Sequence, residues 1–567
     1  MHTLRIAQAQ INPTVGDING NLALIEDFLS QARQAQADIV TFPELAITGY
    51  PPEDLLMKPR FLQDTAAAMG RLVEKCRGIN AVVGYAEYEA GFVFNSAAVI
   101  SDGSLLGSYR KVALPNYGVF DEERYFTPGS GYMVLELKGV RMMLTICEDL
   151  WVPDCMAVRG AFYNQAGITL NISASPFYAG KLNLRRRILM DFAKRSNTYV
   201  YYNNLLGGQD ELVFDGGSLV MNPDGQTIAS ARRFAQDLLV VDLALEEANS
   251  PPKLRLQDGY LNLTDLRPGP REAISAPCAQ ELDLTEEVYE ALVLGTGDYV
   301  RKNGFKKVVL GLSGGVDSSL VAAVAADALG VDNVIGVTMP SPYTSKETRN
   351  DAGRLAANLG IKLLSVPIAR IFAAYLEDLA EAVGEEPSGV VAENLQARIR
   401  GNILMGLSNH FGWLVLTTGN KSETAVGYCT LYGDMAGGFA VIKDVPKTLV
   451  YDLVRQVNAK AGREVVPESV IERAPSAELR PDQKDQDSLP PYEVLDPILK
   501  AYVEQDKVLD EIAALGFEAA VVKQVVRLVD LNEYKRRQAP PGVKITPKAF
   551  GRDRRLPITN HYHPGVE

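Results

Sequence analysis

The run GLSGGVDSS at residues 311–319 has the composition of a loop that binds phosphate groups. Glycine lets the backbone turn tightly and approach an anion, and serine adds hydroxyl donors. The run follows a β-branched segment at residues 306–310 and precedes an alanine-rich segment, so it is expected to join a strand to a helix whose first N–H groups attract anions. Asp317 could hold the metal ion that accompanies the phosphates. The pattern therefore predicts a nucleotide site without the lysine of the Walker loop.

A second chemical set consists of Glu44, Lys111 and Cys147, each at the end of a predicted strand. A thiol that attacks an amide needs a base, and a carboxylate held beside an ammonium group can take the proton. The ammonium group would then stabilise negative charge on the amide oxygen. Only four histidines occur, and three lie near the chain ends, so a histidine base is not favoured. Taken singly, each of the three residues also suits a structural role.

These residues require two alternating α/β regions to position them. In the first, strands are expected near residues 4–9, 39–42, 81–85, 142–146, 168–172 and 199–202. A proline-rich stretch at 249–280 is expected to be a linker between a domain at 1–248 and a domain at 281–567. In the second domain, buried strands near 308–312, 334–339, 362–366 and 413–417 predict a doubly wound parallel sheet with flanking helices.

Composition narrows the class of protein. The chain has 567 residues, of which 47% are hydrophobic and 22% charged, and its net charge is −13, which argues against nonspecific binding to nucleic acid or an anionic membrane. No signal peptide and no apolar run of about eighteen residues is found, so a cytoplasmic location is expected. The five cysteines (Cys76, Cys147, Cys155, Cys278 and Cys429) contain no CxxC pair, so no disulfide framework or structural zinc site is predicted.

The glycine–serine run resembles the SGGxDS signature of the ATP pyrophosphatase family. Members cut ATP between the α and β phosphates, typically to adenylate an oxygen that a nitrogen nucleophile then displaces. The resemblance implies an ATP-binding set, extended to the turn after a later strand: Gly311, Leu312, Ser313, Gly314, Gly315, Val316, Asp317, Ser318 and Thr418.

Roughly residues 1–260 resemble the nitrilase, or carbon–nitrogen hydrolase, superfamily through FPEL with GY, RK and CEDLW around Glu44, Lys111 and Cys147. The resemblance implies an αββα sandwich in which Glu44 is the base, Lys111 the oxyanion partner and Cys147 the nucleophile that forms an acyl-enzyme. It further implies a supporting glutamate, chosen as Glu122 from the acidic triplet at 121–123. The implied glutamine-binding residues are Tyr117, Ser175 and Lys181, with Ser173 as a competitor to Ser175.

As a whole, the chain resembles the glutamine-dependent NAD⁺ synthetase family. That implies ATP as co-substrate with Mg²⁺, L-glutamine as nitrogen donor, deamido-NAD⁺ as acceptor, and at least a homodimer. The carboxylates implied for the metal are Asp317 and Glu423. The residues implied for deamido-NAD⁺ are Asn394, Arg398, Glu423, Lys443 and Lys535.

Three alternatives can be weighed against this interpretation. Asparagine synthetase uses an N-terminal cysteine, whereas residue 2 is His2, and guanosine monophosphate synthetase uses a Cys-His-Glu amidotransferase, which the shortage of histidine disfavours. The third alternative is an amidase fused to a nucleotide-binding regulatory module that turns nothing over. Such a module would bind ATP but release no pyrophosphate.

Overall fold

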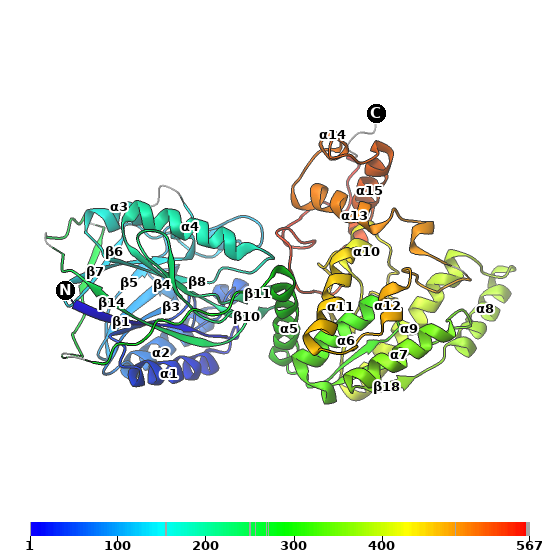
Figure 1. Cartoon of the computed structure of the whole chain (residues 1–567), viewed down its shortest axis with the longest axis horizontal. Helices are drawn as coiled ribbons and strands as arrows, with labels where there is room; N and C mark the ends of the chain where they lie inside the picture. Colours follow the sequence, from blue (N-terminus) through cyan, green and yellow to red (C-terminus); the bar gives the residue numbers. More distant parts are fainter. Residues whose placement is uncertain are drawn as a thin grey trace. The chain divides into compact units, whose positions relative to one another are not determined.

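The computed structural model describes residues 2–152, 156–248, 251–255, 257–267, 269, 271–481 and 483–562. Cys155 and part of the expected linker, including Asn249 and Ser250, lie outside the described residues. The chain forms two compact units (Figure 1). The first contains Met1–Gln209 and Val213–Glu281, and the second contains Asp210–Leu212 and Leu282–Glu567.

The first unit is built on two large sheets. The first sheet has the strand order β14-β1-β2-β3-β4-β5, with bounds Asp237–Leu245, His2–Gln10, Ile39–Thr41, Asn80–Glu89, Phe92–Ser101 and Ser104–Arg110. The second has the order β13-β12-β9-β8-β7-β6-β15, with bounds Thr227–Ser230, Leu219–Met221, Tyr199–Asn204, Ile168–Ser173, Val140–Ile146, Met133–Leu137 and Gly259–Asn262. A further pair consists of β10 (Leu206–Gln209) and β11 (Leu212–Asp215).

These sheets form the middle of a four-layer α-β-β-α sandwich. One apolar core, which includes Leu4, Val82, Leu144 and Leu170, lies between the sheets. Helices α1 (Ile18–Gln34) and α2 (Pro59–Lys75) cover the outer face of the first sheet, and α3 (Met156–Tyr163) and α4 (Lys181–Ser196) cover the second (Figure 1). The predicted αββα architecture is confirmed, and all six strands expected in this half are present.

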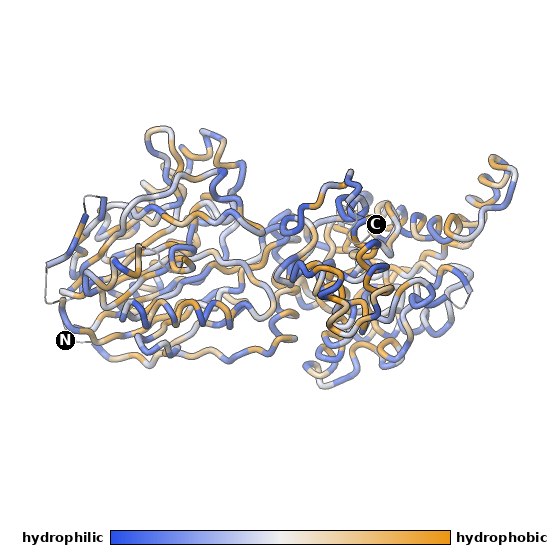
Figure 2. Tube along the Cα trace, turned by 90° about the horizontal axis from the view of Figure 1, so that it is seen from above, coloured by the Kyte–Doolittle hydropathy of each residue, from blue (hydrophilic) through white to orange (hydrophobic). Residues whose placement is uncertain are grey.

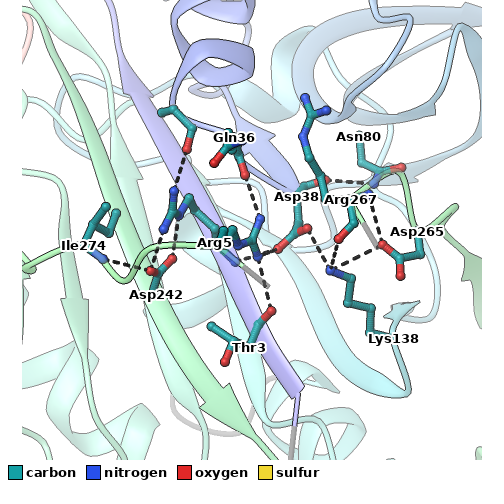
Figure 3. Close-up of polar contacts among 12 residues, drawn as sticks. Thr3, Arg5, Gln36, Asp38, Asn80, Lys138, Asp242, Asp265, Arg267 and Ile274 are labelled. Carbon is teal, nitrogen blue, oxygen red and sulfur yellow. Dashed lines mark hydrogen bonds and ion pairs between the residues drawn. The ribbon is translucent and has the colours of Figure 1, made fainter. Parts of the chain in front are cut away.

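The segment after β14, expected as a linker, contributes β15 to the edge of the second sheet and is then tied to the first unit by charged groups (Figure 3). Arg5 makes two hydrogen bonds to Asp242, at 2.7 and 2.8 Å, and the backbone N–H of Ile274 donates to the same carboxylate at 3.1 Å. Lys138 forms an ion pair with Asp265 at 3.3 Å. Most of the expected linker therefore belongs structurally to the first unit.

The second unit contains a five-stranded parallel sheet of order β18-β17-β16-β19-β20. The strands are Lys362–Ser365, Val334–Thr338, Val308–Gly311, Leu414–Thr417 and Phe439–Ala440. The larger helices are α5 (Leu284–Lys302), α6 (Val316–Leu329), α7 (Lys346–Leu359), α8 (Ala369–Val383), α9 (Val390–Phe411), α10 (Lys421–Val426) and α11 (Lys447–Ala461). The last part of the unit is helical: α12 (Glu468–Glu472), α13 (Tyr492–Leu499), α14 (Leu509–Ala513), α15 (Ala519–Leu531) and α16 (Glu533–Arg536).

This sheet is the doubly wound sheet predicted from the sequence. Stretches of apolar residues, orange in Figure 2, alternate with hydrophilic ones along the trace of both units, which is the pattern expected of buried strands between helices. The strand order reverses between β16 and β19, and ligands of open parallel sheets bind outside the carboxyl ends of strands at such a reversal. The loops that follow β16 and β19 are therefore where a nucleotide site is expected.

Candidate functional sites

The ammonium group of Lys111 lies at the centre of a buried charge cluster in the first unit. Its Nζ donates to Glu44 Oε1 at 2.7 Å and to both carboxylate oxygens of Glu122 at 2.8 Å. Burial alone would lower the pKa of Lys111, but the two carboxylates outweigh it and raise the pKa well above its usual value. The lysine is therefore cationic at neutral pH, as a group that stabilises an oxyanion must be.

Glu44 is fixed by two further donors and by a close backbone contact. Asn95 Nδ2 donates to Oε1 at 2.7 Å, and the backbone N–H of Ala174 donates to Oε2 at 2.8 Å. The loop that carries Glu44 follows β2 and lies against Gly84 of β3. A Cβ atom on Gly84 would lie only 2.3 Å from the Pro43 carbonyl oxygen, so glycine is needed for this approach.

Glu122 belongs to the same cluster. It begins the 3₁₀ turn η2 (Glu122–Arg124), is buried, and also accepts a hydrogen bond from Tyr50 Oη at 2.9 Å. Burial raises the pKa of Glu122 to about 7, although the charge of Lys111 opposes the shift. The structure thus brings the glutamate chosen from the acidic triplet into direct contact with Lys111.

Cys147 begins the 3₁₀ turn η3 (Cys147–Leu150), which follows β7 directly. Its φ of +40° lies in the left-handed region that residues other than glycine rarely occupy. Burial and the charge of Glu44 raise the pKa of the Cys147 thiol, whereas Lys111 acts to lower it. The thiol is therefore protonated at rest and must give its proton to a nearby base before it can attack an amide.

Glu148, the residue after Cys147, and Lys181 carry opposite charges and interact electrostatically. Tyr117 Oη donates to both carboxylate oxygens of Glu148, at 3.0 and 3.2 Å, and Glu148 directly follows Cys147. Burial raises the pKa of Glu148, and Lys181 is one of the cations that act to lower it. Lys181 is itself buried, and its Nζ lies 5.6 Å from the ring centre of Trp151. Sequence reasoning missed Glu148, although its place beside the predicted nucleophile in CED was a usable signal.

Ser175 and Ser173 lie on the loop and strand end of β8. The Ser175 N–H donates to Asn204 Oδ1 at 2.9 Å, and Asn204 Nδ2 donates back to the Ser175 carbonyl at 3.3 Å. The hydroxyl of Ser173 donates to Asn171 Oδ1 at 2.9 Å. The backbone of Ser175 is therefore anchored by Asn204, and the hydroxyl of Ser173 is engaged within the protein.

In the second unit, the glycine–serine run forms a tight turn between β16 and α6. Gly314 has φ of +84°, and a Cβ atom there would lie 2.3 Å from the Thr348 carbonyl oxygen. The Gly315 N–H donates to Ser313 Oγ at 3.2 Å, and the Ser318 hydroxyl donates to the Gly315 carbonyl at 3.0 Å. The turn therefore needs glycine for both conformation and space, and it ends at the first turn of a 14-residue helix.

Three other members of the predicted ATP set lie around this turn. Leu312 and Val316 have buried side chains, so the groups they can offer a ligand are in the backbone. Thr418 follows β19 and is half-buried. The two loops at the reversal of strand order therefore both carry residues of the predicted set.

Two carboxylates predicted to hold a metal converge on one ammonium group. Lys447 Nζ lies 2.5 Å from Asp317 Oδ2 and 3.3 Å from Glu423 Oε1, and Asn420 Nδ2 donates to Asp317 Oδ1 at 2.9 Å. Burial raises the pKa of Glu423 to about 8, with Lys447 opposing and Asp317 adding to the shift. Among the described residues, no group of three or more His, Cys, Asp and Glu side chains forms a metal site. Sequence reasoning missed Lys447, which no local motif marks.

The residues predicted for a dinucleotide divide into two groups. Three of them contact the segment 427–431. Asn394 Oδ1 accepts from Thr430 Oγ1 at 2.7 Å, and Arg398 Nε donates to the Leu431 carbonyl at 3.3 Å. Lys535 Nζ donates to the carbonyls of Gly427 and Cys429, at 2.7 and 2.9 Å. Lys443 instead donates to the Pro540 carbonyl at 2.9 Å. The structure thus brings the first three to one short segment and gives Lys443 other contacts.

Comparison with known proteins assigns each unit to a class. Residues 5–252 match the carbon–nitrogen hydrolase family model, and residues 288–539 match the NAD synthase model. The first unit is thus a carbon–nitrogen hydrolase domain and the second an NAD synthase domain. Within the described residues, no helix has the length and apolar content that a membrane span requires.

Relatives match this chain over nearly its whole length. The chain is 47% identical to the glutamine-dependent NAD(+) synthetase of Thermotoga maritima, with 99% of each chain covered, and 45% identical to that of Aquifex aeolicus, with 99% and 100% covered. A solved structure of the Acinetobacter baumannii enzyme in complex with ADP matches with a TM-score of 0.76 and 40% identity over 99% of each chain. The chain belongs to the family of glutamine-dependent NAD⁺ synthetases.

Proposed function

We infer that this chain hydrolyses L-glutamine in its first unit and uses the ammonia in its second unit to amidate adenylated deamido-NAD⁺. The products are NAD⁺, AMP, diphosphate and glutamate, which makes the protein an ATP-dependent carbon–nitrogen ligase. The observation that carries the inference is the buried Glu44–Lys111–Glu122 cluster, which acts electrostatically on the Cys147 thiol in the same chain as an NAD synthase domain.

In the first unit, we assign Glu44 as the base that takes the proton of Cys147. The sulfur then attacks the side-chain amide carbon of glutamine, and Lys111 stabilises the charge on the oxygen. The carbon–nitrogen bond breaks, ammonia leaves with the proton held by Glu44, and water hydrolyses the thioester to glutamate. Glu122 is the second carboxylate, beside Glu44, that keeps Lys111 charged and in place, and breaking a buried ion pair costs about 3–5 kcal/mol.

Glutamine arrives as a zwitterion, so its recognition needs charges of both signs. Lys181 matches the α-carboxylate and Glu148 the α-ammonium group, while Tyr117 orients the Glu148 carboxylate through its hydroxyl. Ser175 completes the proposed set. This arrangement would bind glutamine in preference to a simple amide, which lacks both the α-carboxylate and the α-ammonium group.

The variant Glu148→Gln is expected to raise the KM for glutamine roughly tenfold or more, because a hydrogen bond to a charged group contributes about 1.5–3 kcal/mol. Glutaric acid monoamide, which lacks the α-ammonium group, should be hydrolysed equally well by both proteins. Initial rates with the two substrates measure the difference. Glu123→Gln, at an exposed site nearby, is the control, and an equal loss with both substrates would refute the assignment.

Gly84→Ala is expected to lower the glutaminase kcat about a hundredfold, because displacing a catalytic group by about 1 Å has an effect of that size. A Cβ atom would lie 2.7 Å from the Cα atom of Glu44 and push the base out of position. Gly70→Ala is the matched control, since a Cβ atom there meets nothing within 4 Å. Unchanged kcat in Gly84→Ala would show that the base tolerates displacement.

In the second unit, residues 311–318 and Thr418 are proposed to bind ATP. The residues proposed to bind deamido-NAD⁺ are Asn394, Arg398, Glu423, Lys443 and Lys535. The carboxylates of Asp317 and Glu423 fit Mg²⁺, which usually takes one or two protein carboxylates and completes its shell with water and substrate phosphates. The ion would neutralise charge on the phosphates as diphosphate leaves. Lys447 adds a second positive charge at the same place and joins the two carboxylates.

We propose a cytoplasmic location for the protein. We also propose that it works as at least a homodimer. Analytical ultracentrifugation of the full chain would measure the subunit number.

The proposed function is tested by supplying ATP, Mg²⁺ and deamido-NAD⁺ with either glutamine or ammonium chloride. NAD⁺ identified by mass, together with equal amounts of AMP and diphosphate, is expected from both nitrogen donors. Glutamate should form only with glutamine. ATP binding without diphosphate release would instead identify the second unit as a regulatory module.

A further inference from the structure

A buried carboxylate that takes no part in the proposed chemistry joins two of the three catalytic segments of the first unit. Asp149 lies two residues after Cys147 and is 2% exposed. Its Oδ1 accepts from the backbone N–H groups of Val112 and Ala113, at 3.1 and 2.9 Å, the two residues that follow Lys111. Four donors in all surround this one side chain.

The other carboxylate oxygen, Oδ2, accepts hydrogen bonds from residues that precede Cys147 and Lys111. Asp149 Oδ2 accepts from the backbone N–H of Ile146 at 2.9 Å, the residue before Cys147, and from Tyr109 Oη at 2.8 Å, two residues before Lys111. The carboxylate therefore bridges the chain on both sides of Lys111 to the chain that leads into the thiol. Hydrogen bonds from several donors to one carboxylate are strong and directional, so the bridge is rigid.

The bridge matters because the Cys147 segment does not have a relaxed backbone conformation. Cys147 has a left-handed backbone, which persists only where surrounding contacts enforce it. The Lys111 main chain is fixed on its other side by β4, because its N–H donates to the Asn95 carbonyl at 2.8 Å. Asn95 in turn binds Glu44 through its side chain. Asp149 thus connects the Cys147 segment to the Lys111 segment, and Asn95 connects the Lys111 segment to Glu44.

We propose that Asp149 is a positioning residue that sets the Cys147 thiol in register with Lys111, and this proposal rests on the glutaminase function inferred above. The carboxylate contacts no reacting atom. It acts by holding the turn that presents the sulfur at a fixed place relative to the ammonium group. Its removal should therefore slow the chemical step more than it weakens substrate binding.

The test compares Asp149→Asn with the unchanged full-length protein. The asparagine side chain keeps the shape but presents an NH₂ group to two N–H or O–H donors. The glutaminase kcat is expected to fall about a hundredfold while the KM for glutamine changes by less than about threefold, as for a misplaced catalytic group. Alkylation of Cys147 by iodoacetamide should slow, and ammonia-supported NAD⁺ synthesis should stay unchanged.

Two further variants make the outcome of this test unambiguous. Asp38→Asn removes another buried aspartate of the first unit, which accepts the Arg5 N–H at 2.7 Å (Figure 3), and should lower the melting temperature without changing kcat. If Asp149→Asn does not fold, Tyr109→Phe removes one of the four donors and should lower kcat roughly fivefold. A kcat within about twofold of the parent in the folded variant would overturn the proposal. If Cys147→Ala lost glutaminase activity while Asp149→Asn kept it, the proposed function would still be supported and only the role of Asp149 would be refuted.

Discussion

Replacing Cys147 by alanine is expected to abolish NAD⁺ synthesis from glutamine and to leave synthesis from ammonium nearly unchanged. Without the sulfur no acyl-enzyme forms, and removal of a nucleophile commonly lowers kcat by at least about 10⁴-fold. The methyl group is smaller than the thiol and sits in a buried place, so the turn should keep its conformation. The measurement is the initial rate of NAD⁺ formation with each nitrogen donor, together with glutamate release.

The control for this variant is Cys278→Ala, which removes an exposed cysteine of the first unit. It should behave as the parent with both donors, within about twofold. An equal loss with glutamine and ammonium in Cys147→Ala would mean that the cysteine supports the fold or the second unit rather than glutamine hydrolysis. Glutaminase activity that survives in Cys147→Ala would assign the nucleophile elsewhere.

Replacing Asp317 by alanine is expected to lower NAD⁺ formation from either donor about 10²–10³-fold. The carboxylate is one of the two proposed to hold Mg²⁺, and it pairs with the buried Lys447. Its loss removes charge that organises the phosphates and leaves a buried ammonium group with one fewer partner. Removal of one electrostatic element of an active site typically lowers kcat about 10²–10³-fold, and diphosphate release should fall by the same factor.

Glutamine hydrolysis distinguishes this effect from general unfolding. Some glutaminase activity should survive in Asp317→Ala, because the residues proposed for glutamine hydrolysis lie in the other unit. Asp327→Ala, at an exposed position of the same helix α6, is the matched control and should keep both activities. Full NAD⁺ synthesis in Asp317→Ala would remove this residue from the ATP site.

Local patterns were sufficient to predict the main architecture. Strands such as β7, β16, β17 and β19 are short, mainly apolar runs between other elements, and such runs are recognisable without tertiary information. β20 (Phe439–Ala440) was not predicted, because two residues carry no periodic signal. β15 was missed because it lies within a stretch whose prolines and charges are typical of a linker. Its pairing with β6 depends on a partner more than a hundred residues earlier.

The sequence by itself determined which residue types were available for chemistry: a thiol, a carboxylate and an ammonium group at strand ends, and a glycine–serine turn before a helix. Only the tertiary structure decided that Glu122 shares the ammonium group of Lys111, that Asp149 connects the segments next to Lys111 and Cys147, and that Lys447 joins Asp317 to Glu423. The physical reason is that motifs are contiguous in the chain, whereas hydrogen bonds and charge pairs depend on which strand ends and helices meet. Burial then sets how strongly those charges act on one another.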